Sequence, residues 1–97
     1  MASKKDWYLV AYDVRDEARL RRVIKVAKAY GERIQLSVFR VRASRRQVER
    51  LRWELLRILE DDDFLLVVGL CESCVGRIYQ RGGGPWTADE DAPFALV

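Results

Sequence analysis

Two strand-like segments that are apolar on both faces constrain the fold of this chain most strongly. Trp7–Asp13 (WYLVAYD) and Phe64–Leu70 (FLLVVGL) are rich in aromatic and β-branched residues, which is typical of strands. Neither segment alternates cleanly between apolar and polar residues, so each presents apolar side chains to both sides of a sheet. A chain of 97 residues makes one domain with a single core. That domain must therefore cover its sheet on both sides.

Two amphipathic helices are predicted in addition to these strands. The first begins after an N-cap at Asp16 and runs to about Tyr30, where Gly31 ends it as a C′ glycine. The second begins with a capping box formed by Ser44 and Gln47, and the acidic run Glu60–Asp63 ends it. Apolar residues recur at helical spacing in both: Leu20, Val23, Ile24, Ala27 and Tyr30 in the first, and Val48, Leu51, Leu55, Ile58 and Leu59 in the second.

The segment between the helices, Arg33–Arg42, alternates with a period of two and is predicted to be extended. It is either one long bent strand or two strands separated by a tight kink near Ser37, and the pattern leaves both possibilities open. The resulting order of elements is the βαββαβ order of an α+β sandwich with the ferredoxin-like fold.

Two helices cover only one face of such a sheet. The other apolar face needs a partner, most simply a second copy of the chain, so we expect a homodimer. Residues 1–81 are expected to form the ferredoxin-like core, and residues 82–97 a linker and a C-terminal strand. The linker contains a flexible break at Gly82–Pro85, and the short apolar segment Phe94–Val97 is expected to pair with the partner protomer.

Charge is distributed unevenly along the chain. Residues 1–81 hold all 18 Lys and Arg residues against 12 acids, and the remaining residues are acidic. A basic body favours a polyanionic partner such as nucleic acid. Four cations of the first helix are the candidate phosphate contacts, although a solvated helix face would show the same pattern: Arg21, Arg22, Lys25 and Lys28.

The residue types exclude some chemistry. The chain has no histidine, which excludes His-based acid–base catalysis, Ser-His-Asp triads and His metal ligands. The pair Cys71-x-x-Cys74 has no second pair with which to complete a zinc site, so two reduced, partly buried thiols are expected. No apolar segment is long enough to span a bilayer. We therefore expect a cytoplasmic protein with no membrane partner.

The candidate site lies where the first strand ends. Asp13 is placed there by a rigid strand, and Asp16 follows three residues later at the start of the helix. A carboxylate at the exposed end of a buried strand is well placed to bind a metal or to act in catalysis. The alternative is that Asp13 only ends the strand and Asp16 only caps the helix.

Several segments in order along the chain resemble the small CRISPR-associated protein two family, the non-integrase subunit of the spacer-acquisition machinery. The resemblance rests on Tyr12-Asp13-Val14, Asp16, Arg19, the segment from Tyr30-Gly31 to Ser37-Val38-Phe39, the acidic turn Glu60–Asp63, Leu70-Cys71 and Gly84-Pro85-Trp86. One departure is Arg40, where many members of the family carry Glu.

The resemblance implies a homodimer with facing sheets, in which each C-terminal strand joins the partner's sheet. It also implies a Mg²⁺ site, with Mn²⁺ as a substitute, built from Asp13 of each protomer as metal ligand and catalytic residue. Asp16 and Arg19 are expected to support this site. Ser37 would reach the phosphate or a water on the metal, and Phe39 would pack near the substrate; their alternative roles are a strand hydroxyl and a core ring.

The function implied by the resemblance has two forms. One is a metal-dependent endonuclease for single-stranded RNA or duplex DNA that takes part in spacer acquisition. The other is a non-catalytic DNA-binding scaffold that bridges the dimers of the CRISPR integrase subunit. The sequence does not separate them, because both need basic helices and a dimer.

Overall fold

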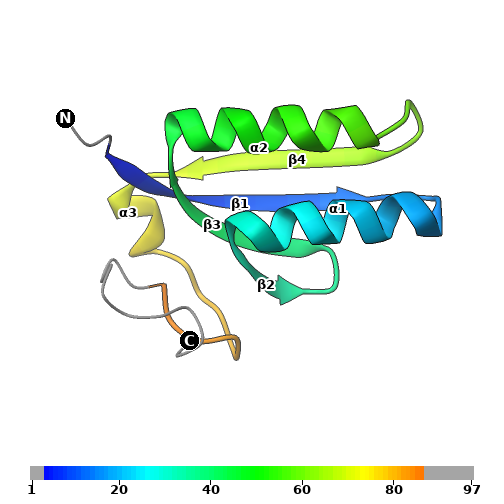
Figure 1. Cartoon of the computed structure of the whole chain (residues 1–97). Coiled ribbons are helices and arrows are strands. Elements are labelled where there is room, and N and C mark those ends of the chain that lie inside the picture. Colours follow the sequence, from blue (N-terminus) through cyan, green and yellow to red (C-terminus); the bar gives the residue numbers. More distant parts are fainter. Residues whose placement is uncertain (1–3, 87–97) are drawn as a thin grey trace.

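The computed structural model describes residues 4–86. The elements are β1 (Lys5–Asp13), α1 (Glu17–Tyr30), β2 (Glu32–Gln35), β3 (Val38–Ser44), α2 (Arg45–Ile58), β4 (Phe64–Leu70) and the short α3 (Glu72–Val75). The four strands form one antiparallel sheet in the order β2-β3-β1-β4. Helices α1 and α2 lie side by side on one face of it (Figure 1). The predicted ferredoxin-like fold is confirmed; the predicted C-terminal strand at Phe94–Val97 lies outside the described residues.

The region between the helices contains two strands. β2 and β3 are separated by a turn at Leu36 and Ser37, and their register shifts between Arg33 and Gln35. The kink near Ser37 is therefore the correct one of the two possibilities that the alternating pattern allowed. It matters for the site, because it places the turn beside the end of β1: the Tyr12 N–H donates to the carbonyl of Ser37 over 3.1 Å.

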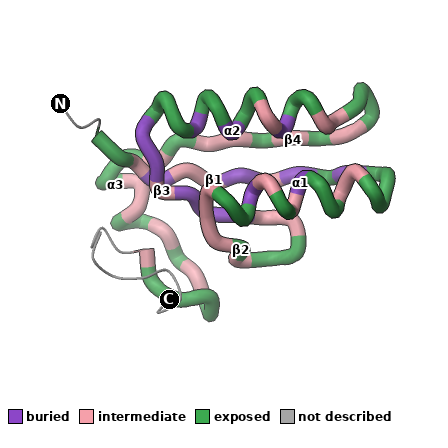
Figure 2. Tube along the Cα trace, viewed as in Figure 1, coloured by how far each residue is buried: buried purple, intermediate pink, exposed green. Residues whose placement is uncertain are grey.

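The hydrophobic core fills the space between the sheet and the two helices. The buried segments follow β1, β3 and the inner sides of the helices in Figure 2. The side chains that meet there come from β1 (Val10 and Tyr12), β3 (Phe39, Val41 and Ala43), α1 (Val23 and Ala27) and α2 (Val48, Leu51 and Leu55). None of the helices in residues 4–86 is both long and apolar enough to cross a membrane.

The predicted helix starts are confirmed. Asp16 accepts the Arg19 N–H over 2.9 Å, and Ser44 and Gln47 form both bonds of the capping box. The prediction of a C′ glycine at Gly31 is wrong, because its φ of −160° is extended backbone open to any residue. The actual reason for glycine at this position is steric. A Cβ at Gly31 would lie 2.3 Å from the Arg40 carbonyl oxygen and 2.6 Å from a methyl group of Val41.

The face of the sheet away from the helices, here called the open face, remains partly uncovered. Antiparallel partners point to the same side of a sheet, so the register places Leu9, Ala11, Leu66 and Val68 on this face. β4 was expected to be buried on both faces. In the single chain it is an edge strand, and Leu66 is 44% exposed.

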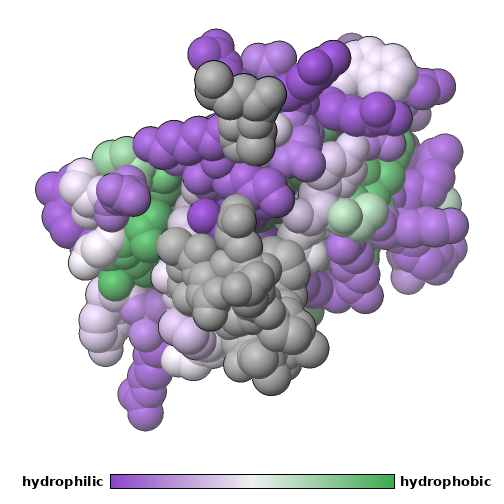
Figure 3. Space-filling model, turned by 60° about the vertical axis from the view of Figure 1, so that its left-hand side comes forward, coloured by the Kyte–Doolittle hydropathy of each residue, from purple (hydrophilic) through white to green (hydrophobic). Residues whose placement is uncertain are grey.

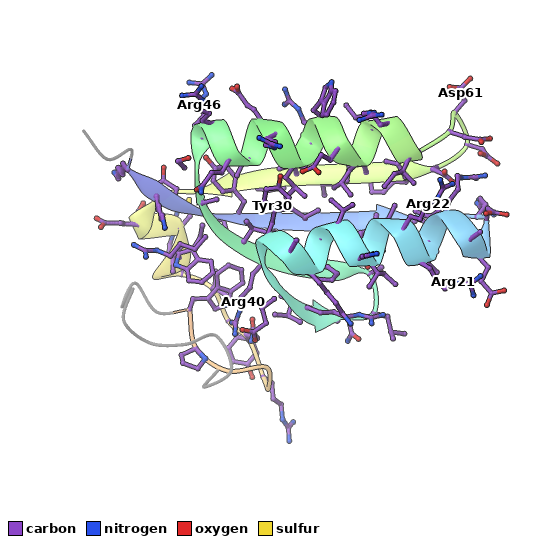
Figure 4. All side chains as sticks on the ribbon, viewed as in Figure 1. Arg21, Arg22, Tyr30, Arg40, Arg46 and Asp61 are labelled. Atoms are coloured by element: carbon purple, nitrogen blue, oxygen red, sulfur yellow. The ribbon has the colours of Figure 1, made fainter. Side chains whose placement is uncertain are left out.

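The segment after α3 returns to the open face of its own sheet. Trp86 packs edge-on against Trp7, with ring centroids 5.1 Å apart, and Arg40 lies 5.4 Å from the Trp86 ring. The fully buried guanidinium of Arg40 donates to the carbonyls of Gly83 (2.9 Å) and Gly84 (3.1 Å), and Figure 4 shows it pointing toward this segment. The predicted flexible break is therefore anchored, with Gly82, Gly83 and Gly84 at φ values of 81–83° that favour glycine.

Candidate functional site

Asp13 is the last residue of β1 and lies on the open face opposite Phe64 of β4. Its side chain is exposed and makes no hydrogen bond or ion pair with any other residue in the described range. The strand that carries it is held on both sides, by β3 and by β4. Asp13 is thus an unengaged carboxylate on a rigid element, at the edge of an apolar face.

A groove of about 490 Å³ lies beside Asp13, between the end of β1, α1 and the β2–β3 turn. Its polar side chains include Asp13, Arg33 and Ser37, and its apolar lining includes Leu36. Arg33 donates to the Leu36 carbonyl over 2.9 and 3.2 Å, which holds the guanidinium at the turn. The structure thus brings Ser37 to the Asp13 end of the sheet. It adds Arg33, which lies in the Tyr30–Phe39 segment but was not predicted to be a site residue.

Arg19 and the acidic turn form a clamp next to this end of the sheet. The Arg19 guanidinium donates to both oxygens of the Asp63 carboxylate, over 2.9 and 3.1 Å. The same carboxylate accepts the backbone N–H groups of Arg15 and Glu60, each over 3.0 Å. These four hydrogen bonds hold the pKa of the Asp63 carboxyl well below its usual range, and the bonding by Arg19 has the largest effect.

The clamp assigns roles to the acidic residues. The side chain of Asp63 is buried and fully engaged, and that of Asp16 is engaged as the cap of α1. Asp61, in contrast, is exposed and points away from the molecule (Figure 4). Arg19 supports the loop that follows Asp13 by binding Asp63. Sequence reasoning treated Asp63 only as the end of a helix and missed this contact.

Phe39 and Ser37 occupy different layers of the fold. Phe39 is completely buried on the helix side of the sheet, and its ring centroid lies 6.1 Å from that of Tyr12. It is a core ring in this structure and has no surface to offer a substrate. Ser37 is half-buried in the turn and lines the groove.

The cations on the helices form an exposed basic surface. Arg21, Arg22, Lys25 and Lys28 are all exposed on α1, and Figure 4 shows Arg21 and Arg22 near the start of that helix, at the same end as the β1 terminus. The outer side of α2 adds further exposed cations: Arg45, Arg46, Arg50, Arg52 and Arg57. Hydrophilic side chains cover the part of the molecule over α2 (Figure 3). Some of the α2 cations have local partners: Arg45 lies 3.4 Å from Glu49, and Arg57 lies 4.8 Å from the centre of the Trp53 ring.

One protomer supplies few ligands for a metal. Within residues 4–86, no group of three or more His, Cys, Asp or Glu side chains could hold an ion. Asp13 offers a single carboxylate, and Mg²⁺ accepts so few protein ligands because it keeps waters and takes oxygens from a phosphate. A Mg²⁺ ion at Asp13 would therefore need oxygen ligands beyond those of one protomer.

Comparisons with known proteins agree with this architecture. The model of a family described as CRISPR associated protein Cas2 matches residues 6–78. A Thermus thermophilus protein named CRISPR-associated endoribonuclease Cas2 is 37% identical over 92 residues, covering 93% of this chain and 98% of that protein. A second relative, from another strain of the same species, is named CRISPR-associated endonuclease Cas2 2. It is 43% identical over 82 residues, covering 84% of this chain and 87% of its own.

Solved structures share this fold. The crystal structure of a hypothetical protein from Thermus thermophilus superimposes with a TM-score of 0.73 at 36% identity, covering 84% of this chain and 96% of that one. A chain of a partial Cas6-RT-Cas1–Cas2 complex shares the fold, with a TM-score of 0.68 at 21% identity over 82% of this chain and 94% of that chain. The match to the family model covers most of the sheet and both long helices, and the chain belongs to the CRISPR-associated Cas2 family.

Proposed function

We propose that this chain is a Mg²⁺-dependent endonuclease that acts as a homodimer, with Asp13 of each protomer as the metal ligand and catalytic residue. The observation that carries the proposal is the unengaged Asp13 carboxylate at the end of β1 on the open face. The names of the relatives, one an endoribonuclease and one an endonuclease, support nuclease chemistry in the family.

A second copy of the chain completes the proposed site. The open face exposes Leu66 and Phe64 on β4, and burying such apolar side chains favours association. A two-fold arrangement of two open faces brings the same strand end from each protomer into one interface. Two Asp13 carboxylates close together repel each other unless a cation lies between them. Dimerisation therefore creates the need for the metal.

The residues of the groove are proposed to position the scissile phosphate. Bound Mg²⁺ would polarise the phosphate and offset the negative charge that develops on it. Arg33 presents a guanidinium to the same groove, and the Ser37 hydroxyl lies in its wall. Arg21 and Arg22, in the first two turns of α1, would bind neighbouring phosphates of the strand. Asp13 would hold the cation while these groups orient the substrate.

The proposed substrates are single-stranded RNA and duplex DNA, and the proposed setting is spacer acquisition. Exposed cations on two helices suit any phosphate backbone and do not discriminate between the two. The partner we propose is the CRISPR integrase subunit, Cas1. A chain of a partial Cas6-RT-Cas1–Cas2 complex shares this fold.

The second candidate function is a DNA-binding scaffold that joins integrase dimers without cutting. Its support is the small number of metal ligands in one protomer against the large number of exposed cations on α1 and α2. In this form Asp13 would be a residue at the dimer axis without a catalytic duty.

Metal dependence separates the two functions. Purified dimer is mixed with single-stranded RNA or duplex DNA in Mg²⁺, in Mn²⁺ and in chelator, and Mn²⁺ binding is measured by calorimetry. The nuclease predicts cleavage with either metal, none in chelator, and one strongly bound ion for each pair of chains. Asp61→Asn is the matched control, because it removes an exposed carboxylate from the same end of the molecule. Binding of duplex DNA without cleavage of either substrate, and without metal uptake, would establish the scaffold.

A further inference from the structure

Cys71 and Cys74 lie at the end of β4, where the chain turns into α3. Their sulfur atoms are 3.2 Å apart, and both cysteines are free. Cys71 is exposed and Cys74 is half-buried. The expectation of two partly buried thiols is therefore correct for Cys74 and wrong for Cys71, which a reagent can reach from solvent.

The surroundings of Cys71 favour its reactive form. Its sulfur lies 3.1 Å from the Ser73 hydroxyl. Hydrogen bonding by Ser73, and then by Cys74, lowers the pKa of the Cys71 thiol to about 7. The thiolate is the nucleophile in thiol–disulfide exchange, so the lowered pKa of Cys71 favours its reactive form near neutral pH.

We propose that Cys71 and Cys74 form a reversible dithiol–disulfide site whose substrates are disulfides of the glutathione class, with exposed Cys71 as the attacking thiol and Cys74 as the resolving one. Among residues 4–86, no further His, Cys, Asp or Glu joins the pair in a group that could hold a metal. The two sulfurs are therefore better placed to react with each other than to bind an ion.

The reaction proceeds in two exchanges. The Cys71 thiolate attacks one sulfur of oxidised glutathione, the glutathione S–S bond breaks, and one glutathione thiolate leaves. Cys74 then loses its proton to solvent and attacks the Cys71 sulfur, which releases the second glutathione thiolate. Two cysteines are oxidised to one disulfide, one glutathione disulfide is reduced to two thiols, and the two cysteine protons end on those thiols.

The local backbone accommodates this bond. A disulfide requires a sulfur–sulfur distance of about 2.05 Å, so the two atoms must approach by roughly 1 Å. The Val75 N–H already bonds to the Cys71 carbonyl over 3.0 Å, which holds the two cysteines on one turn. The proposed bond therefore requires only that the side chains rotate within that turn.

The oxidation state of the two cysteines would affect the segment that returns to the open face. Glu72 and Val75 of α3 line a cavity of about 110 Å³ together with Trp7 and Trp86. A disulfide across the turn of α3 stiffens one wall of that cavity. The other wall is Trp86, which anchors the end of the described chain on Trp7.

The test uses the full-length native protein in buffers that contain reduced and oxidised glutathione at set ratios. After an acid quench, mass spectrometry is expected to show the loss of two hydrogens, and a non-reducing digest a bond between Cys71 and Cys74. A reductant should restore both thiols. Cys74→Ser should accumulate glutathione on Cys71, and Cys71→Ser should react about tenfold more slowly, because it lacks the exposed thiolate.

Four results would overturn the proposal. The native thiols could stay free in buffers that oxidise the urea-unfolded chain, or glutathione could remain on Cys71 of the wild type without release. Oxidation could join only separate chains. A zinc ion that binds tightly to the reduced protein and depends on both cysteines would make the pair a metal site instead. Circular dichroism of each serine variant checks that it is folded, so slow reaction of Cys71→Ser reports on the thiol alone.

Discussion

The guanidinium of Arg19 donates two hydrogen bonds, of 2.9 and 3.1 Å, to the carboxylate of Asp63, which lies 44 positions away in the sequence. Asp63 also accepts the N–H of Arg15, two residues beyond Asp13. One buried carboxylate thus ties the loop after β1 to the turn before β4. The position of Asp13 depends on this clamp as well as on the sheet.

Asp63→Asn should destabilise the protein at neutral pH, because the neutral amide cannot accept from every donor that now faces the carboxylate. Its N–H₂ group would also meet the guanidinium of Arg19. Cleavage should fall as well, since the loop next to Asp13 loosens. Thermal melting and cleavage rate measure the two effects. Asp61→Asn should change neither, because Asp61 is exposed and outside the clamp.

The clamp also predicts how stability depends on pH. The pKa of the Asp63 carboxyl is held below that of an unfolded Asp, about 3.9. Its stabilisation is therefore complete well above pH 4 and is lost as the pH falls through the unfolded value toward the folded one. Urea unfolding of wild type and Asp63→Asn between pH 7 and pH 3 should show a difference that shrinks toward acid. A difference that stays constant would show that the charge of Asp63 plays no part.

The role of Asp16 as the N-cap of α1 can be tested separately from any role in cleavage. Asp16→Ala removes the bond to the Arg19 N–H and should cost about 1 kcal/mol of stability, with a smaller effect on cleavage. Ser44→Ala removes the cap of α2 and should cost a similar amount. If Asp16→Ala abolishes cleavage while Ser44→Ala leaves it intact, Asp16 belongs to the catalytic site and its capping role is secondary.

The basic face of α1 makes a prediction about salt. Charge reversal of Arg21, Arg22 and Lys25 should weaken nucleic-acid binding for every sequence and flatten its dependence on salt, because fewer counterions are released. Charge reversal of Arg45, Arg46 and Arg50 on α2 is the matched comparison. An unchanged salt slope for the α1 variant, with a flattened one for the α2 variant, would place the nucleic acid on α2.

The C-terminal residues are predicted to have two separable roles. A chain that ends after Arg81 leaves the buried Arg40 without the carbonyls of Gly83 and Gly84, at a cost of about 1–3 kcal/mol. It should also dimerise more weakly. A chain that ends after Trp86 keeps these contacts and should lose only dimer affinity. Sedimentation and thermal melting distinguish the two; a dimer as strong in both truncations as in the full chain would rule out strand exchange.

Local patterns in the sequence predicted most of the fold, and long-range contacts explain what was missed. Apolar periodicity located both helices, and aromatic and β-branched content located β1. The Ser44–Gln47 pair identified a helix start. Each of these signals depends on residues a few positions apart. The Arg19–Asp63 clamp joins residues 44 positions apart, and so does the bond from Arg40 to Gly84. No local pattern contains such contacts.

The candidate site was likewise predicted only where local patterns determine it. Asp13 was found because a strand end is visible in sequence. The position of Phe39 depends on which face of β3 the helices cover, and the register of the sheet decides that. Gly31 was correctly placed at a helix end. The position requires glycine because β3 approaches it closely, and the sequence of the helix does not reveal that approach.

The most direct test of the central claim is the cleavage rate of Asp13→Asn in saturating Mg²⁺, measured beside its affinity for the same nucleic acid. Asn keeps the shape of the side chain and removes the charge that would hold the cation. Cleavage is predicted to fall by about 100-fold or more, as expected for loss of a principal electrostatic group, while the affinity stays within about twofold because many cations share the binding. Cleavage by Asp13→Asn at the wild-type rate, in a preparation free of other nucleases, would contradict the account.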